Sequence, residues 1–305
     1  MALNFVAGRS GSGKTEYCLK SIAKKHKENY NGLSILIVPD QFSFQAEKDL
    51  IAAMGNKVIM RAKVLSFTRL AHTVFSKTGC GKTIPLTDVS KAVALRKIMI
   101  DNAEKLLYYK KSADKKGFSE QLSSIITEFF RYTVPPQKLL DACEGGGEAL
   151  GLKIKDLALI YGEYINFINE GYLSSEETLD ILYGAIDGYR ALEGAEIWID
   201  GFDGFTPQEY KIIGKLLKIS GNVTVVLTMD RQAAASDRLV PSDLFFGPKE
   251  TYLKLCRIAS DAGVEIKAPV FMDTAVRYKS AGIANFEKNY WRTFFKSGMG
   301  HEGIA

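Results

Sequence analysis

The sequence predicts an α/β protein in which a helical subdomain is inserted into a parallel β-sheet. Short apolar segments alternate with amphipathic helical segments near both ends of the 305-residue chain, the pattern of a doubly wound sheet. From about residue 86 to residue 190 the strand pattern disappears and helical periodicity replaces it. A glycine-rich sequence joins the first strand segment to the first helical segment, as in proteins that hold phosphate at a helix start.

The composition is that of an ordinary globular protein, with 46% hydrophobic and 25% charged residues. No run approaches the roughly 18 apolar residues that span a bilayer, and the N-terminus lacks the basic region and cleavage pattern of a signal peptide. We therefore expect a cytoplasmic protein without membrane contact. The four cysteines and three histidines have no metal-ligand or disulfide spacing.

The charge is distributed unevenly along the chain. Residues 1–84 carry 13 Lys and Arg against 5 Asp and Glu, residues 85–189 carry 12 against 16, and residues 190–305 carry 15 against 14. A basic first segment fits a polyanionic partner. The four lysines between residues 20 and 27 equally fit the solvated face of one helix, so both interpretations stay open.

The first part of the chain reads as three strand–helix pairs. The apolar residues 2–7 predict a strand, and apolar positions 19, 22 and 23 predict a helix over 15–27. The β-branched run 34–39, closed by a proline, predicts a second strand, and a helix over 43–55 ends at Gly55. The third pair is a strand over 57–65 and a helix over 66–75.

The middle of the chain reads as helices only, over 89–109, 120–132, 153–171 and 174–186. Ser174 and Glu177 predict a capping box at the start of the last of them. Strands return at 195–200, 222–230 and 264–272. Thr206 is the predicted N-cap of a helix, with Pro207 in its first turn and Glu209 completing a capping box. The predicted domains are a split α/β domain (1–84 and 191–275), the helical insert (85–190) and the start of a following domain (276–305).

The sequence between the first strand and the first helix matches GxxxxGK[ST], the phosphate-binding loop. Backbone N–H groups of such a loop surround phosphate oxygens, Lys14 reaches the β- and γ-phosphates of ATP, and Thr15 ligates Mg²⁺. A second GKT at residues 81–83 lacks the preceding glycine and the following helix, so it is not a candidate. The predicted nucleotide-binding residues are Gly8, Arg9, Ser10, Gly11, Ser12, Gly13, Lys14 and Thr15.

Asp200 ends an apolar strand, which is where a phosphate-loop protein places its second Mg²⁺-holding carboxylate. The alternative is that Asp200 only begins a turn, because DGFDG is rich in turn residues. The next residue, Gly201, has no carboxylate to activate water, a role that typically contributes ~10²–10⁴-fold to catalysis. We therefore predict a site that binds ATP and Mg²⁺ weakly and hydrolyses the nucleotide slowly or not at all.

Several further motifs give the chain a resemblance to a known family. The phosphate loop, VPDQFSFQAEKDL, VLSFTRLA, WIDGFDGFTPQE, VVLTMDRQ and ANFEKNYW resemble the start of AddB (RexB) proteins. These are the B subunits of the bacterial ATP-dependent helicase/deoxyribonuclease, which processes double-strand DNA breaks. They are related to superfamily 1 helicases, so the resemblance implies a P-loop NTPase (RecA-like) sheet.

The resemblance also implies what this chain lacks. Asp200 keeps the Mg²⁺ position of active helicases, whereas Gly201 replaces their catalytic Glu and Asp203 stands where they have Gln. The motor activity of the complex belongs to an AddA-type partner subunit, which together with AddB forms a heterodimer. The nuclease domain and its iron–sulfur cluster lie in the C-terminal region of a longer protein, so the resemblance implies that this chain is an N-terminal fragment.

In related helicases the segments after the second and third strands contact single-stranded DNA. Aromatic faces that stack on bases beside basic residues are the expected chemistry. The alternative for the three phenylalanines is that they fill the core at helix starts. The candidates are Gln41, Phe42, Phe44, Gln45, Ser66, Phe67 and Arg69.

Two other functions stay open from the sequence. A small-molecule kinase would use the same phosphate loop, although the chain shows no compact Arg-rich lid. A purely structural subunit would carry the loop as a vestige.

Overall fold

The computed structural model describes residues 1–28, 30–55, 61–79, 84–112, 115, 117–145, 147–173, 177–236 and 238–290. The chain splits into two compact units. The first comprises Met1–Leu70, Tyr189–Phe205 and Ile213–Ala305, and the second comprises Ala71–Gly188 and Thr206–Ile212. The predicted domain boundaries stay predictions.

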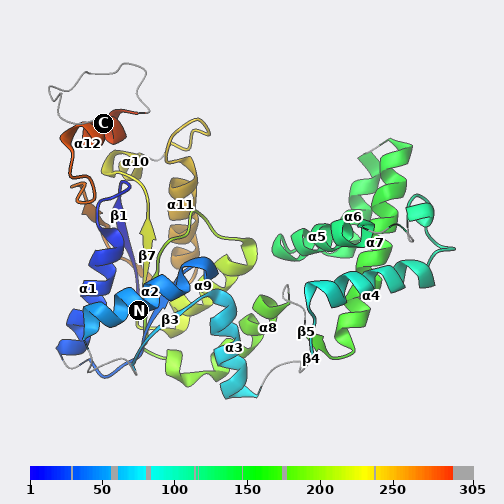
Figure 1. Ribbon diagram of the computed structural model, residues 1–305, viewed down its shortest axis with the longest axis horizontal. Helices are drawn as coiled ribbons and strands as arrows, with labels where there is room; N and C mark the ends of the chain where they lie inside the picture. Colours follow the sequence, from blue (N-terminus) through cyan, green and yellow to red (C-terminus); the bar gives the residue numbers. More distant parts are fainter. Residues whose placement is uncertain are drawn as a thin grey trace. The chain divides into compact units, whose positions relative to one another are not determined.

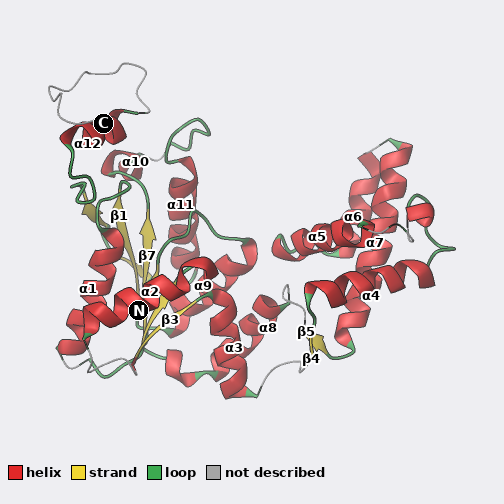
Figure 2. Ribbon diagram, in the orientation of Figure 1, coloured by secondary structure: helices red, strands yellow, loops and turns green. Residues whose placement is uncertain are grey.

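The first unit is built on a seven-stranded sheet in which every pair of neighbouring strands is parallel (Figures 1 and 2). The strand order is β3-β2-β6-β7-β1-β8, with β9 also pairing with β1. The predicted α/β fold is confirmed, and its architecture is RecA-like. The strands are β1 (Ala2–Gly8), β2 (Ser34–Ile37), β3 (Ala62–Leu65), β6 (Glu196–Ile199), β7 (Asn222–Leu227), β8 (Glu265–Ile266) and β9 (Val270–Met272).

The predicted strand over 264–272 is wrong in one respect, because the structure divides it into β8 and β9. Both lie along the same side of β1, with residues 265–266 beside Ala2 and Leu3 and residues 270–272 beside Val6 to Gly8. Pro269 lies between them and has no N–H to donate to the ladder. Of the predicted strand over 57–65, residues 57–60 lie outside the described part of the chain.

Helices cover both faces of the sheet. The helices of this unit are α1 (Lys14–Lys27), α2 (Ser43–Met54), α3 (Phe67–Thr78), α9 (Pro207–Ile219), α10 (Arg231–Ala235), α11 (Phe246–Asp261) and α12 (Ala281–Asn289). Helices α3 and α9 are each divided between the two units. Short 3₁₀ turns occur at η1 (Asp40–Phe42) and η6 (Arg190–Leu192). As predicted, α2 ends at Gly55, whose φ of 66° suits glycine.

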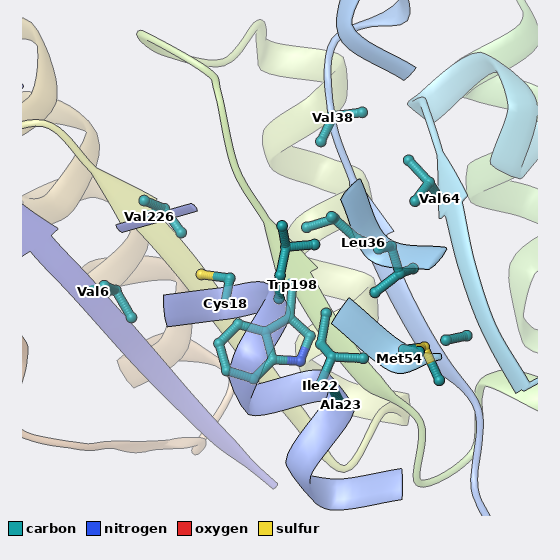
Figure 3. Packing of buried hydrophobic residues seen from close by; sticks show 13 residues of the cluster. Val6, Cys18, Ile22, Ala23, Leu36, Val38, Met54, Val64, Trp198 and Val226 are labelled. Atoms are coloured by element: carbon teal, nitrogen blue, oxygen red, sulfur yellow. The ribbon is translucent and has the colours of Figure 1, made fainter. Parts of the chain in front are cut away.

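The core on one face of the sheet is centred on Trp198 (Figure 3). Its indole packs among Cys18 and Ile22 of α1 and Leu36 of β2, and all of these side chains are buried. Alternate residues of each strand point to the other face. There Phe5 of β1 meets Tyr252 of α11 edge to face, with ring centroids 4.6 Å apart.

The second unit is mostly helical, as predicted. It contains α4 (Asp88–Asp101), α5 (Phe118–Arg131), α6 (Pro136–Asp141), α7 (Glu148–Asn169), α8 (Thr178–Ala185), the 3₁₀ turns η3 (Lys110–Ser112), η4 (Ala142–Gly145) and η5 (Ile186–Gly188), and the strands β4 (Ile84–Pro85) and β5 (Tyr172–Leu173). The prediction that no strand occurs between residues 86 and 190 is wrong at β5, which pairs in parallel with β4. A two-residue strand shows no periodicity in the sequence.

The predicted helix over 89–109 ends early, at Asp101. The buried carboxylate of Asp156 on α7 accepts hydrogen bonds of 2.8–3.1 Å from the backbone N–H groups of Leu107, Tyr108 and Tyr109. These N–H groups would otherwise bond to carbonyls of their own helix. Asp156, 47 to 49 positions further along the chain, therefore takes the place of the helical carbonyl acceptors, and the helix does not continue.

The two predicted capping boxes have different outcomes. At α9, the Thr206 N–H donates to Glu209 Oε2 at 2.7 Å and the Glu209 N–H donates to Thr206 Oγ1 at 3.3 Å, so this box is confirmed. At α8 the predicted box joins Ser174 to Glu177, and because Ser174 lies outside the described residues, this box stays a prediction. The GKT at 81–83 also lies outside the described residues. Within the described residues, no helix has the length and hydropathy needed to cross a membrane.

Candidate nucleotide-binding site

The predicted phosphate loop connects the carboxyl end of β1 to the N-terminus of α1. Gly11 and Gly13 have φ angles of 74° and 84°, in the left-handed region that favours glycine. Gly8 is required for a different reason, because a Cβ there would lie 2.5 Å from Ser12 Oγ and 2.6 Å from the Met272 carbonyl oxygen. The three glycines of the motif therefore fix the backbone path of the loop.

The Lys14 side chain lies along the loop. Its ammonium donates hydrogen bonds to the carbonyl oxygens of Gly8 at 2.8 Å and Arg9 at 2.9 Å. Burial lowers the pKa of Lys14; the Asp200 carboxylate opposes this effect, while the positive charge of Arg277 adds to it. The ammonium is therefore held beside the loop by weak neutral acceptors, which a phosphate oxygen can replace.

Thr15 and Asp200 meet at this edge of the sheet. Thr15 Oγ1 donates a hydrogen bond of 2.6 Å to Asp200 Oδ2. Asp200 directly follows β6, is 7% exposed and donates its N–H to the Ile37 carbonyl. Because β6, β7 and β1 are adjacent and parallel, their carboxyl ends lie at the same edge. A hydroxyl and a carboxylate oxygen brought this close are the ligand types that Mg²⁺ prefers.

The residues of the loop fit a polyphosphate. A cavity of about 450 Å³ is lined by residues 11–16 together with Leu19, Asp49, Val276 and Arg277. The first N–H groups of α1 have no acceptor within the helix. The buried hydroxyl of Ser12 has no hydrogen-bond partner among the described residues. Unpaired donors beside a cavity at a helix N-terminus are the chemistry that binds phosphate.

Gly201 follows Asp200 in a left-handed conformation, with a φ of 83°. A Cβ at this position would lie 3.3 Å from Pro39 Cδ. The backbone after Asp200 therefore turns in a direction that a glutamate would not easily adopt. Asp203 is exposed to solvent. Neither residue provides a buried carboxylate next to Asp200.

Arg9, the second residue of the loop, uses its guanidinium to bind carboxylates. Nε lies 3.0 Å and 3.2 Å from the two carboxylate oxygens of Glu287 on α12, and Nη1 lies 3.3 Å from Asp230 Oδ2. Nη2 donates to the Glu287 carbonyl at 2.8 Å, and the guanidinium lies 5.2 Å from the centre of the Phe245 ring. Three of the five guanidinium N–H donors are therefore engaged with Glu287 and Asp230.

Sequence reasoning missed Asp230, Glu287 and Arg277 as neighbours of the loop. Asp230 lies just after β7, so the strand-end rule that found Asp200 could have found it. Glu287 and Arg277 come from the segment after β9, and no pattern in the sequence signals their contact with a loop more than 260 residues earlier.

The first group of DNA-contact candidates lies on the surface of the first unit. Phe42 in η1 is 52% exposed and Phe44 at the start of α2 is 79% exposed, so neither ring fills the core. Gln41 is also exposed, and Gln45 donates a hydrogen bond of 2.7 Å to Asp49. The alternative that these two rings are core residues is therefore wrong.

The second group is largely buried. Phe67 is 4% exposed, and its ring centroid lies 5.6 Å from that of Phe202 and 6.4 Å from that of Phe205. Ser66 is 2% exposed, and its hydroxyl accepts the N–H of Arg69. Arg69 itself is half exposed and forms a 2.9 Å ion pair with Glu47. Of this group, the structure leaves Arg69 at the surface.

The comparison with known proteins agrees with the resemblance in the sequence. The family described as "ADDB, N-terminal" matches residues 5–287. The chain belongs to the AddB N-terminal family. It is 40% identical over 296 residues to the B subunit of the ATP-dependent helicase/deoxyribonuclease of Caldanaerobacter subterraneus subsp. tengcongensis, an alignment that covers 95% of this chain and 25% of that protein.

Other members of the AddB N-terminal family show the same coverage. The B subunits of the ATP-dependent helicase/deoxyribonucleases of Thermoanaerobacter sp. (strain X514) and Clostridium botulinum (strain Langeland) are each 37% identical to this chain, over 297 and 301 residues. Each alignment covers 97% of this chain and about a quarter of the relative, 25% and 26% respectively. The chain thus spans about a quarter of the length of the curated relatives it matches.

Proposed function

We propose that this chain is the nucleotide-binding, helicase-like part of the B subunit of a helicase–nuclease that processes double-strand DNA breaks. It binds ATP with Mg²⁺ and hydrolyses it negligibly. The observation that carries the proposal is the 2.6 Å contact between Thr15 and Asp200 at the head of the phosphate loop. The relatives named as B subunits of a helicase/deoxyribonuclease support its assignment to such a complex. In this proposal an AddA-type partner subunit supplies the motor activity.

Each residue of the site has a defined role in this proposal. Lys14 exchanges its two carbonyl acceptors for β- and γ-phosphate oxygens. The N–H groups at the start of α1 and the Ser12 hydroxyl bind further phosphate oxygens. Thr15 and Asp200 would hold Mg²⁺, which neutralises phosphate charge when bound. Gly201 leaves attacking water without a carboxylate partner, so the nucleotide is retained.

The test is equilibrium binding of a labelled ATP analogue, with Mg²⁺, to the wild type and to Lys14→Ala. Charge-assisted hydrogen bonds contribute about 1.5–3 kcal/mol each, so the variant should bind about 10- to 150-fold more weakly. Lys20→Ala, which removes an exposed charge from α1 outside this cavity, is the matched control and should bind as the wild type does. Equal affinity of Lys14→Ala and wild type would contradict nucleotide binding by the loop and would favour a structural subunit in which the loop is vestigial.

A DNA contact belongs to the same proposal. Phe42 and Phe44 present exposed rings beside Gln41 and Gln45, the arrangement that stacks on unpaired bases. Arg69 adds a half-exposed positive charge on the adjacent helix α3. The burial of Phe67 gives its ring a packing role.

The double variant Phe42→Ala/Phe44→Ala tests this contact. Base–aromatic stacking contributes about 1–3 kcal/mol per base, so affinity for a fluorescent single-stranded oligonucleotide should fall at least tenfold. Tyr132→Ala removes a ring that is 60% exposed in the second unit and should leave the affinity unchanged. Unchanged binding by the double variant would exclude these rings from DNA recognition.

A further inference from the structure

The segment after β9 crosses the phosphate loop and is bonded to it. The backbone N–H groups of Val276 and Arg277 both donate to the Gly11 carbonyl oxygen, at 2.9 Å and 3.0 Å. A Cβ on Gly11 would lie 3.0 Å from Arg277 Cβ, and a Cβ on Gly13 would lie 3.0 Å from Val276 Cγ2. We call residues 273–278 the strap. The strap lies so close to the loop that a side chain at Gly11 or Gly13 would crowd it.

Arg277 lies near Lys14. Arg277 lines the same cavity as Lys14 and Thr15. Burial lowers the pKa of Lys14 most, and the positive charge of Arg277 is the next largest cause that lowers it. Two cations that share a cavity repel each other, and a polyanion bound between them relieves that repulsion.

Arg277 also differs from the other arginines around the loop. Arg9 and Arg231, which line the neighbouring cavity, are each paired with carboxylates. Among the described residues, no carboxylate lies within ion-pair distance of Arg277, and its side chain is exposed to solvent. Its planar guanidinium suits bidentate bonding to phosphate oxygens.

We propose that Arg277 is a second phosphate-binding cation of this site, carried on the strap of the same chain and aimed at the polyphosphate of the nucleotide. The inference rests on the proposed nucleotide binding and extends it. The two backbone bonds to Gly11 fix the base of the side chain, so little conformational freedom is lost on binding. The nucleotide is thereby held from two sides, by α1 and by the strap.

The experiment measures binding of a non-hydrolysable ATP analogue and of inorganic tripolyphosphate to the full 305-residue chain. Arg277→Ala should raise both dissociation constants about tenfold or more, the effect of losing a charge-assisted hydrogen bond, and should reduce their dependence on salt. Arg277→Lys, which keeps the charge, should recover part of the affinity. Lys279→Ala removes an exposed charge two residues further on, outside the cavity lining, and should bind as the wild type does. Circular dichroism of each variant establishes that it is folded.

Two results would overturn the inference while nucleotide binding stands. One is wild-type affinity in a folded Arg277→Ala variant when Lys14→Ala has lost binding. The other is weaker binding of the ATP analogue with unchanged binding of tripolyphosphate, which would assign Arg277 to the base or ribose. A wild-type chain that binds neither ligand would overturn the proposed function, and this inference with it.

Discussion

At the scale of single residues, the proposed site combines candidate phosphate and Mg²⁺ ligands with the absence of a carboxylate next to Asp200. Lys14 and Thr15 lie at the start of α1, and the contact between Thr15 and Asp200 links α1 to the end of β6, as the proposed nucleotide site requires. Gly201 lacks a carboxylate, and it also has a backbone conformation that favours glycine. Its positive φ and its closeness to Pro39 show that the local backbone is shaped for glycine.

Restoring a glutamate at this position should therefore fail. Gly201→Glu forces a side chain into a left-handed conformation, which costs about 1–2 kcal/mol. We expect a lower midpoint of thermal unfolding and no gain in ATP turnover, measured by calorimetry and a phosphate-release assay. Gly201→Asn is the control, since asparagine adopts this conformation more readily and should destabilise less. A stable Gly201→Glu variant with clear ATPase activity would show that the backbone does present a carboxylate to water.

The meeting of the predicted phosphate loop with Asp200 could be anticipated because the signals for both are local. Glycine spacing identifies the loop, and a carboxylate at the end of an apolar strand identifies Asp200. Arg277 and Glu287 could not be predicted, because they reach the loop only through the fold. The exposure of Phe42 and the burial of Phe67 were equally open, since both aromatics lie near helix starts.

At the scale of elements, helix boundaries set by neighbouring residues could be predicted, and those set by distant contacts could not. The box between Thr206 and Glu209 and the glycine after α2 were predicted from neighbouring residues. The end of α4 at Asp101 was not, because Asp156 determines the conformation of the residues that follow. Helix α11 was not predicted either, since its buried face is established only by packing on the sheet.

The capping box at α9 gives a prediction on stability. Thr206→Ala removes the acceptor for the Glu209 N–H, and loss of such a cap costs about 1 kcal/mol. Denaturant unfolding should show this loss, with unchanged nucleotide affinity because the cap lies outside the phosphate loop. Thr206→Ser keeps the hydroxyl and should retain most of the stability. Equal stability of Thr206→Ala and wild type would mean that water replaces the cap at no cost.

At the scale of the whole chain, the order of the strands explains how distant sequence segments form one site. Strand β7 lies between β1 and β6, so the loop after β1 and Asp200 after β6 meet at one edge although 185 positions separate Thr15 from Asp200. The alternation of strands and helices predicted the parallel sheet. It did not predict the break at Pro269, which precedes β9 and the strap.

The central claim is that this chain binds ATP with Mg²⁺ and retains it without hydrolysis. The most direct measurement follows one sample of wild-type chain, first by equilibrium binding of ATP–Mg²⁺ and then by steady-state release of phosphate. We predict saturable binding together with turnover far below 1 s⁻¹, the low end of typical enzymes at about 1–10³ s⁻¹. Turnover of 1 s⁻¹ or more, or no binding at millimolar ATP, would contradict the account.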